Sequence, residues 1–148
     1  MLLNQRQRHL HYLLLALCLL SRTLPLVAAD DNSVVPRYKT ADNVLYRDGD
    51  ELTDEMQKRC RLDVYYPEDQ REFATVVWFH GGGLTGGVRS IPTPLKEQGI
   101  AVVAVSYRLS PQVKSPVWLE DAAAAVAWTF QHIGEFGGSN NRIFVSGH

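Results

Sequence analysis

The chain has 148 residues, of which 45% are hydrophobic, and its formal net charge is -1 at pH 7. The length allows one domain at most, and the hydrophobic content is ordinary for a globular protein. A nearly neutral chain has no electrostatic attraction to nucleic acid or to an anionic membrane, so neither is expected as a partner.

The first 29 residues have the pattern of a secretory signal peptide. Arg6 and Arg8 precede an apolar run at 12–20, Pro25 ends the run, and 27–29 offer small residues suited to signal peptidase. The run is about half of the roughly 20 residues that a bilayer-spanning helix needs, so no stable membrane span is expected. An uncleaved anchor or a wrongly assigned start of the chain is the alternative. The pattern predicts a secreted or periplasmic protein.

Residues 30–54 are polar and poorly periodic, and we expect a surface lead-in with at most a short strand at 44–46. The domain itself is then expected over 55–148. Cys60 has no cysteine partner once the signal peptide is removed. The neighbouring arginines could lower the pKa of its thiol, but a small residue at the start of a strand is the favoured interpretation.

Four strands are predicted after this lead-in. Residues 61–66 alternate polar and apolar side chains, which is typical of a half-exposed strand near a sheet edge. Residues 74–79 and 100–105 are continuously apolar, and 142–145 begin a third such run. Continuous apolar strands indicate a sheet that is covered on both faces, which usually means parallel strands joined by helices.

Two helices are predicted between these strands. Thr93 can cap a short helix over 93–98, and Ser115 can cap a longer one that starts at Pro116 and ends before Gly137. The apolar face of the longer helix is formed by Leu119, Ala123, Val126, Phe130 and Ile133. Strands that alternate with helices predict an α/β fold with a mostly parallel sheet and helical crossovers.

The segment His80-Gly81-Gly82-Gly83 directly follows the apolar strand 74–79. Glycines allow a ligand to approach main-chain N–H groups closely, and such groups can stabilise the oxyanion of a tetrahedral intermediate. A structural turn without a catalytic role is the alternative. A phosphate-binding loop requires Gly-Lys-Ser/Thr, which 84–87 do not supply, and no long helix follows to suit a dinucleotide.

A second motif begins at the end of the chain. Gly147 and His148 follow the strand 142–145 and match the first two residues of a Gly-X-Ser-X-Gly nucleophile elbow. Gly147 would be the first glycine, His148 would precede the nucleophile, and the serine would come next. Half an elbow is weak evidence by itself, but an upstream His-Gly-Gly-Gly loop is the expected partner of such an elbow.

Residues 61–148 resemble the N-terminal half of α/β-hydrolase carboxylesterases of the hormone-sensitive-lipase type, and more closely the secreted bacterial acetyl-xylan or feruloyl esterase-like enzymes. The segments that carry the resemblance are 62–67, 80–83, 106–109, 120–122 and 141–148.

The resemblance implies that Gly82 and Gly83 supply oxyanion-hole N–H groups, while His80 and Gly81 shape the loop. The catalytic serine, acid and histidine would follow the elbow, so the chain by itself is expected to be inactive. The implied substrate is a small-molecule or polysaccharide-linked ester, with no metal or organic cofactor. Leu84 stands where many relatives carry Trp or Phe. An amide-cleaving relative and a non-catalytic binding protein remain alternatives.

Overall fold

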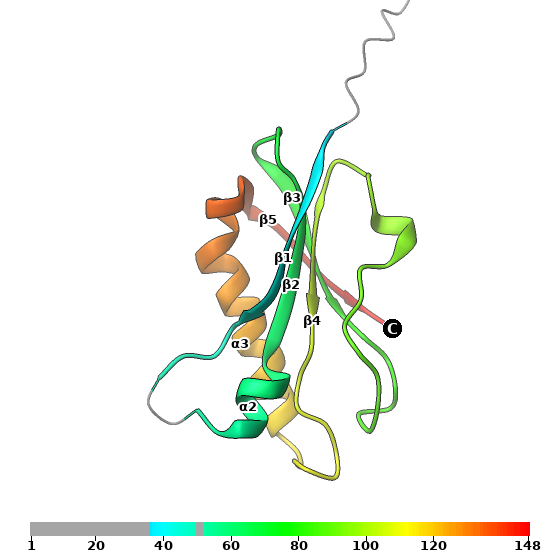
Figure 1. Cartoon of the computed structure of the whole chain (residues 1–148), viewed down its shortest axis with the longest axis vertical. Helices are drawn as coiled ribbons and strands as arrows, with labels where there is room; N and C mark the ends of the chain where they lie inside the picture. The colour runs from blue at the N-terminus through cyan, green and yellow to red at the C-terminus, as the bar shows by residue number, and fades with distance from the viewer. Residues whose placement is uncertain (1–35, 50–51) are drawn as a thin grey trace, which may run out of the picture. The chain divides into compact units, whose positions relative to one another are not determined.

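The computed structural model describes residues 36–49 and 52–148, so the predicted signal peptide lies outside the described residues (Figure 1). Five strands form one sheet: β1 (Tyr38–Leu45), β2 (Arg61–Pro67), β3 (Phe73–Phe79), β4 (Ala101–Val105) and β5 (Gly138–Gly147). The helices are α2 (Asp54–Arg59) and α3 (Val117–His132), with short 3-10 turns η1 (Thr93–Leu95) and η2 (Ile133–Phe136).

The strand order is β1-β2-β4-β3-β5. β3 pairs in parallel with β4 and β5, whereas β2 is antiparallel to β1 and β4. The α/β fold class is therefore confirmed, but the sheet is mixed rather than mostly parallel. Only the short connection 68–72 joins β2 to β3. A short connection reverses the chain, whereas a parallel neighbour needs a longer crossover.

The two longer connections lie on opposite sides of the sheet (Figure 1). The β3–β4 connection, which contains η1, places β4 on one side of β3 in the sheet. The β4–β5 connection, which contains α3, runs in the opposite direction and places β5 on the other side of β3. Because parallel crossovers are right-handed, opposite steps place their connections on opposite faces. The sheet is thus covered by α3 on one face and by an irregular segment on the other.

The predicted polar lead-in contains a full strand, which corrects the expectation of at most a short strand at 44–46. β1 pairs with β2 over most of its length and is irregular between Ala41 and Val44, where Asn43 has a φ of +59°. Most of its side chains remain exposed or half-buried. Main-chain hydrogen bonds to a neighbour, rather than an apolar face, make this segment a strand, which is why its sequence lacks periodicity.

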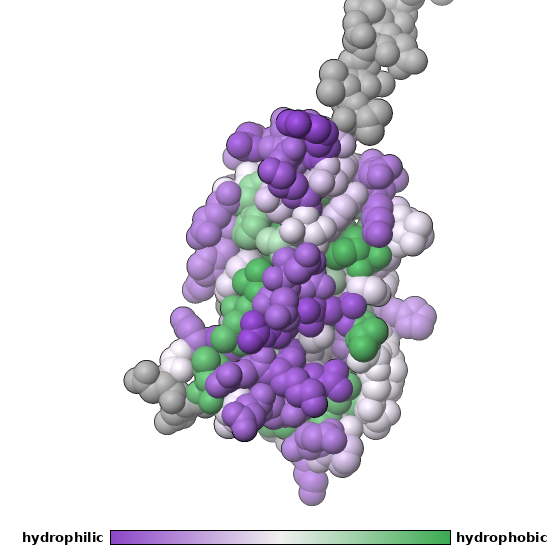
Figure 2. Space-filling model, viewed as in Figure 1, coloured by the Kyte–Doolittle hydropathy of each residue, from purple (hydrophilic) through white to green (hydrophobic). Residues whose placement is uncertain are grey.

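Figure 2 shows mostly hydrophilic side chains on the face seen in this view.

Several element boundaries also differ from the predictions. The short helix expected over 93–98 is the 3-10 turn η1, and Pro116 rather than Ser115 is the N-cap of α3, without a side-chain capping bond. β5 begins at Gly138, which pairs with Phe73, instead of at Arg142.

The core lies between the sheet and α3, and every residue of β4 is buried. The helix meets the sheet through Asp121, Ala125 and Thr129, followed by Ile133. The predicted apolar face is therefore only partly correct: Ile133 is buried and Val126 packs half-buried against the core, but Leu119 is 64% and Phe130 47% exposed. Small side chains on the buried face allow the helix to approach the sheet closely, and Trp128 packs half-buried against the core beside them.

Candidate active site

Three strand ends meet at one edge of the sheet. Phe79, the last residue of β3, pairs with Val105 of β4 on one side and with Gly147 of β5 on the other. The residues that follow these strands therefore lie side by side. In a sheet of parallel strands, the edge beyond the carboxyl ends is where ligands bind.

The two predicted halves of the site are brought together at this edge. The N–H of His148 donates to the carbonyl of Phe79 at 3.1 Å. A Cβ added to Gly81 would lie 2.5 Å from Nδ1 of His148 and 2.9 Å from its carbonyl oxygen. Only glycine at position 81 allows this approach. The loop 80–83 and the start of the predicted elbow at Gly147 and His148 are therefore direct neighbours.

The main-chain carbonyls of Gly81 and Gly82 are engaged within the loop. Nδ1 of His80 donates to the carbonyl of Gly81 at 2.8 Å, and the N–H groups of Thr85 and Gly86 both donate to the carbonyl of Gly82 at 3.1 Å. In a trans peptide the N–H points away from the carbonyl of the same unit. The N–H groups of Gly82 and Gly83 therefore point away from these acceptors, and neither has a protein acceptor among the described residues.

A second pair of glycines completes the loop, and sequence reasoning used it only to exclude nucleotide binding. Gly87 has a φ of +102°, and a Cβ there would overlap the carbonyl oxygen of Gly81 and Nδ1 of His80. Likewise, a Cβ on Gly82 would overlap the carbonyl oxygen of Gly86. The pair Gly86-Gly87, which closely follows 80–83 in the sequence, was the signal that could have indicated that the two glycine segments pack against each other.

Tyr107 holds the first residue of the loop. Its hydroxyl donates to the carbonyl of His80 at 2.7 Å, and its ring stacks on the imidazole with centroids 4.6 Å apart and planes 12° apart. Both side chains are buried. Burial raises the pKa of the Tyr107 hydroxyl above its ordinary value, so the group stays a donor.

The carboxylate of Asp121 fixes the segment after β4 against α3. Arg108 donates to it through Nε at 2.8 Å, Nη2 at 2.7 Å and its main-chain N–H at 3.1 Å, and Arg47 adds a contact of 2.9 Å. Burial by itself raises the pKa of Asp121, but the hydrogen bonds from the two arginines outweigh it and leave the pKa below its ordinary value. Asp121 is fully buried in this network.

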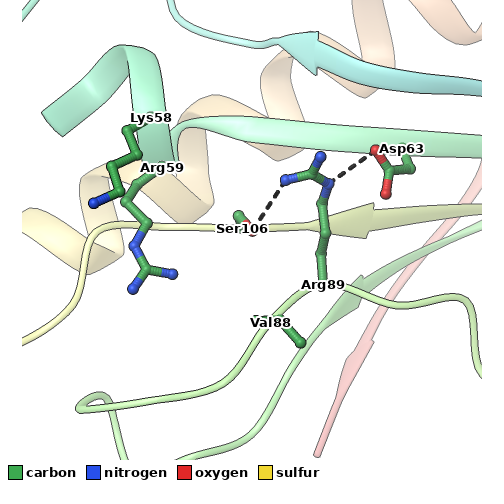
Figure 3. Close-up of a pocket in the computed structure, with 6 residues that line it drawn as sticks. All are labelled: Lys58, Arg59, Asp63, Val88, Arg89 and Ser106. Carbon is green, nitrogen blue, oxygen red and sulfur yellow. Dashed lines mark hydrogen bonds and ion pairs between the residues drawn. The ribbon is translucent and has the colours of Figure 1, made fainter. Parts of the chain in front are cut away.

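Arg89, two residues after Gly87, connects the segment that follows the glycine loop to the sheet. Its Nε lies 2.8 Å from Oδ1 of Asp63 on β2, and Nη2 donates to Oδ1 of Asn43 at 3.1 Å. Beside it is a cavity of about 280 Å³ that is rich in basic side chains (Figure 3). The cavity is lined by Lys58, Arg59, Asp63, Val88, Arg89 and Ser106. The carboxylates of Asp63 and Asp121 both have arginine partners.

An apolar hollow of about 170 Å³ lies next to the glycine loop. It is lined by Phe79, Leu84, Tyr107, Trp118, Leu119 and Ala122. Leu84 has a φ of +62°, a backbone conformation that is uncommon for a residue with a side chain. The hollow can take a small apolar group of a bound molecule.

Other candidate chemistry finds no support in the described part of the chain. Burial raises the pKa of the Cys60 thiol, so the flanking arginines do not make it reactive. No group of three or more His, Cys, Asp or Glu side chains within 36–49 and 52–148 is arranged to hold a metal ion. Among these residues, no helix is long and apolar enough to cross a membrane.

The mixed sheet, the crossover helix and the glycine loop beside the end of β5 define an α/β-hydrolase fold. Residues 62–148 match the model of the BD-FAE family, and the chain belongs to this family.

Curated relatives and solved structures agree with this assignment. The chain is 38% identical over 124 residues to Lipase 2 of Moraxella sp. (strain TA144), a match that covers 79% of this chain and 27% of that protein. It is 34% identical to Carboxylesterase NlhH of Mycobacterium tuberculosis, with 77% and 35% covered. The crystal structure of Esterase B from Lactobacillus rhamnosis (HN001) superposes with a TM-score of 0.63 at 26% identity, with 76% and 36% covered.

The chain thus spans about a quarter to a third of the length of the curated relatives that it matches.

Proposed function

We propose that this chain supplies the oxyanion-stabilising part of a serine carboxylesterase site. The observation that carries the proposal is the pair of N–H groups on Gly82 and Gly83. Both point away from carbonyls that are engaged inside the loop, and the loop lies against His148 at the carboxyl edge of the sheet. Donors of this kind stabilise the negative charge that develops on a carbonyl oxygen during acyl transfer.

The nucleophile is proposed to be a serine in the position after His148, as in the elbow pattern. Its hydroxyl would attack the ester carbonyl, while a histidine accepts the proton and the carbonyl oxygen becomes an oxyanion at Gly82 and Gly83. Collapse of this intermediate breaks the bond to the alcohol oxygen, which takes up the proton, and leaves an acyl-enzyme. Water then attacks the acyl carbonyl in the same way and releases the acid.

The substrate is proposed to be an ester with a small apolar group on one side of the carbonyl. The hollow lined by Phe79, Leu84 and Trp118 adjoins the glycine loop and is predominantly apolar. Its volume of about 170 Å³ suits a short group better than a long chain. The other side of the ester is a small alcohol or a polysaccharide hydroxyl.

The natural gene product, with any residues encoded after His148, should hydrolyse short-chain nitrophenyl esters. It should also form a covalent adduct with a serine-reactive phosphonate, which mass spectrometry would place on the residue after His148. The 148-residue chain assayed in parallel should show no hydrolysis above buffer. Hydrolysis of an anilide in preference to the matching ester would point to an amide-cleaving enzyme. A gene product with neither adduct nor hydrolysis would point to a binding protein.

We also propose, from the signal-peptide pattern of residues 1–29, that the protein is exported from the cytoplasm. N-terminal sequencing of protein recovered from the medium or periplasm should begin at Asp30. Replacing Ala29 with a bulky residue should block cleavage and retain the precursor. Recovery of the unprocessed protein from the cytoplasm of wild-type cells would contradict the proposal.

A further inference from the structure

We infer that Tyr107 is a positioning residue for the oxyanion hole and acts through His80. The inference rests on the proposed ester hydrolysis, because the group it positions is the N–H of Gly82. Tyr107 follows β4, whereas the glycine loop follows β3, so two separate strand ends are joined at this point.

The first step is the contact between Tyr107 and His80. Tyr107 is only 7% exposed, and its hydroxyl donates to the carbonyl of His80 at 2.7 Å. Its ring is also stacked on the imidazole at 4.6 Å and tilted against Phe79 at 6.2 Å. Tyr107 therefore holds both the main chain and the side chain of His80.

The second step is the contact between His80 and Gly81. A carbonyl oxygen can only accept, so Nδ1 of His80 must carry the hydrogen of the bond to Gly81. The other ring nitrogen, Nε2, is buried and has no hydrogen-bond partner among the described residues. The imidazole is therefore positioned by its hydrogen bond to the Gly81 carbonyl and by stacking on the Tyr107 ring.

The third step is the direction of the Gly82 N–H. Because the Gly81–Gly82 peptide is planar, the imidazole that fixes its carbonyl also fixes its N–H. Glycines on both sides make this peptide easy to rotate when the anchor is lost. An oxyanion hole accelerates reaction because its donors are already oriented, so a donor free to rotate stabilises the transition state less.

The decisive experiment compares Tyr107→Phe with Tyr46→Phe in the natural, esterase-active gene product. Tyr46 is an unusually close match, since it is 5% exposed and its hydroxyl donates to the main-chain carbonyl of Ser106 at 2.8 Å. Both substitutions remove one buried Tyr-to-carbonyl hydrogen bond, but only one of these carbonyls belongs to the glycine loop. The thermal midpoint of unfolding should fall by a similar amount in both variants.

In Tyr107→Phe, kcat for a short-chain nitrophenyl ester should fall about 10- to 100-fold while KM changes by less than about threefold, because the lost interaction operates mainly in the transition state. Tyr46→Phe should keep kcat within about threefold of the wild type. Equal losses of kcat in the two variants would overturn the inference, and so would a Tyr107→Phe variant with full kcat.

A measurement that does not depend on activity separates this inference from the proposed function. In amide NMR spectra of the 148-residue chain, Tyr107→Phe should shift the Gly82 resonance and speed its hydrogen exchange, and Tyr46→Phe should do neither. A wild-type gene product without esterase activity would remove the proposed function while these spectra still decide whether Tyr107 orients the loop. An unchanged Gly82 resonance in Tyr107→Phe would overturn the inference.

Discussion

Single residues decide the geometry of the candidate site, because the loop is built from backbone contacts that exclude a side chain. Gly81 meets His148, Gly82 meets Gly86, and Gly87 meets His80. Gly83 differs, since it has a φ of +61° but open space around its Cβ position. The glycines are thus required for two separate reasons, which are close approach and left-handed backbone conformation.

Gly87→Ala should destabilise the protein by about 3 kcal/mol, because its Cβ would overlap His80 and the residue would have to keep a positive φ. Gly86→Ala is the matched control, with open space and no positive φ, and should change the unfolding free energy by less than about 0.5 kcal/mol. Denaturant unfolding measures both values. Equal effects would show that the contact with His80 is absent in solution.

Asp121→Asn tests the buried ion-pair network and should cost about 3 kcal/mol at pH 7, because two arginines lose their counter-charge. The folded-state pKa of Asp121 is depressed below its ordinary value of 3.8, so its stabilisation is present above that pH. The stabilisation is lost as the pH falls through the lower, folded-state pKa.

Unfolding measured from neutral to acidic pH should therefore show a smaller loss of stability in Asp121→Asn than in the wild type. Asp42→Asn, at an exposed position, is the control and should follow the wild type. A variant curve parallel to the wild-type curve throughout would show that Asp121 does not titrate in this way.

At the level of elements, α3 shows how an apolar pattern can identify a helix and misplace its buried face. Its fully buried residues are Asp121, Ala125, Thr129 and the following Ile133. Two of these are polar and would not be chosen as core from the sequence. Asp121 is buried because arginines meet it, and Thr129 because its hydroxyl donates to the carbonyl of Ala125 at 2.9 Å.

Ile133→Ala and Leu119→Ala separate the predicted helix face from the observed one. Ile133 is fully buried, and its truncation should cost about 3 kcal/mol. Leu119 is 64% exposed, and its truncation should cost less than about 1 kcal/mol. Thermal or denaturant unfolding of the two variants gives the comparison, and similar losses would restore the face predicted from periodicity.

At the level of the whole molecule, the described sheet has edges of two different kinds. β1 forms one edge with mostly polar residues, and β5 forms the other with Phe144 59% and Val145 61% exposed. An apolar edge strand offers unpaired main-chain groups together with side chains that favour association. The 148-residue chain is therefore expected to associate through β5.

Val145→Lys should reduce this association, because a charge on an edge strand opposes pairing with another chain. Val88→Lys is the control, since Val88 is 72% exposed but lies in a loop. Sedimentation velocity across a range of protein concentrations should show a smaller fraction of oligomer for Val145→Lys alone. A wild-type chain that stays monomeric at every concentration would contradict the prediction.

The amino-acid sequence by itself determined the buried strands and the glycine loop. β3 and β4 are continuous apolar runs, and 80–83 is a local motif at a strand end. Such features depend on neighbours in the chain, so they can be read without knowing the fold. The sequence also indicated that Gly147 and His148 lie near the loop, because a His-Gly-Gly-Gly loop and a nucleophile elbow occur together in one site.

Only the tertiary structure decided the pairing of β1, the buried face of α3 and the partners that orient the loop. Tyr107 meets His80 because β3 and β4 end at the same edge, and Asp121 meets Arg47 across 74 positions of the chain. Nothing in the sequence around either residue of these pairs indicates that the two are in contact. Their stabilisation appears only after the sheet has assembled, which is why periodicity and motif spacing did not reveal them.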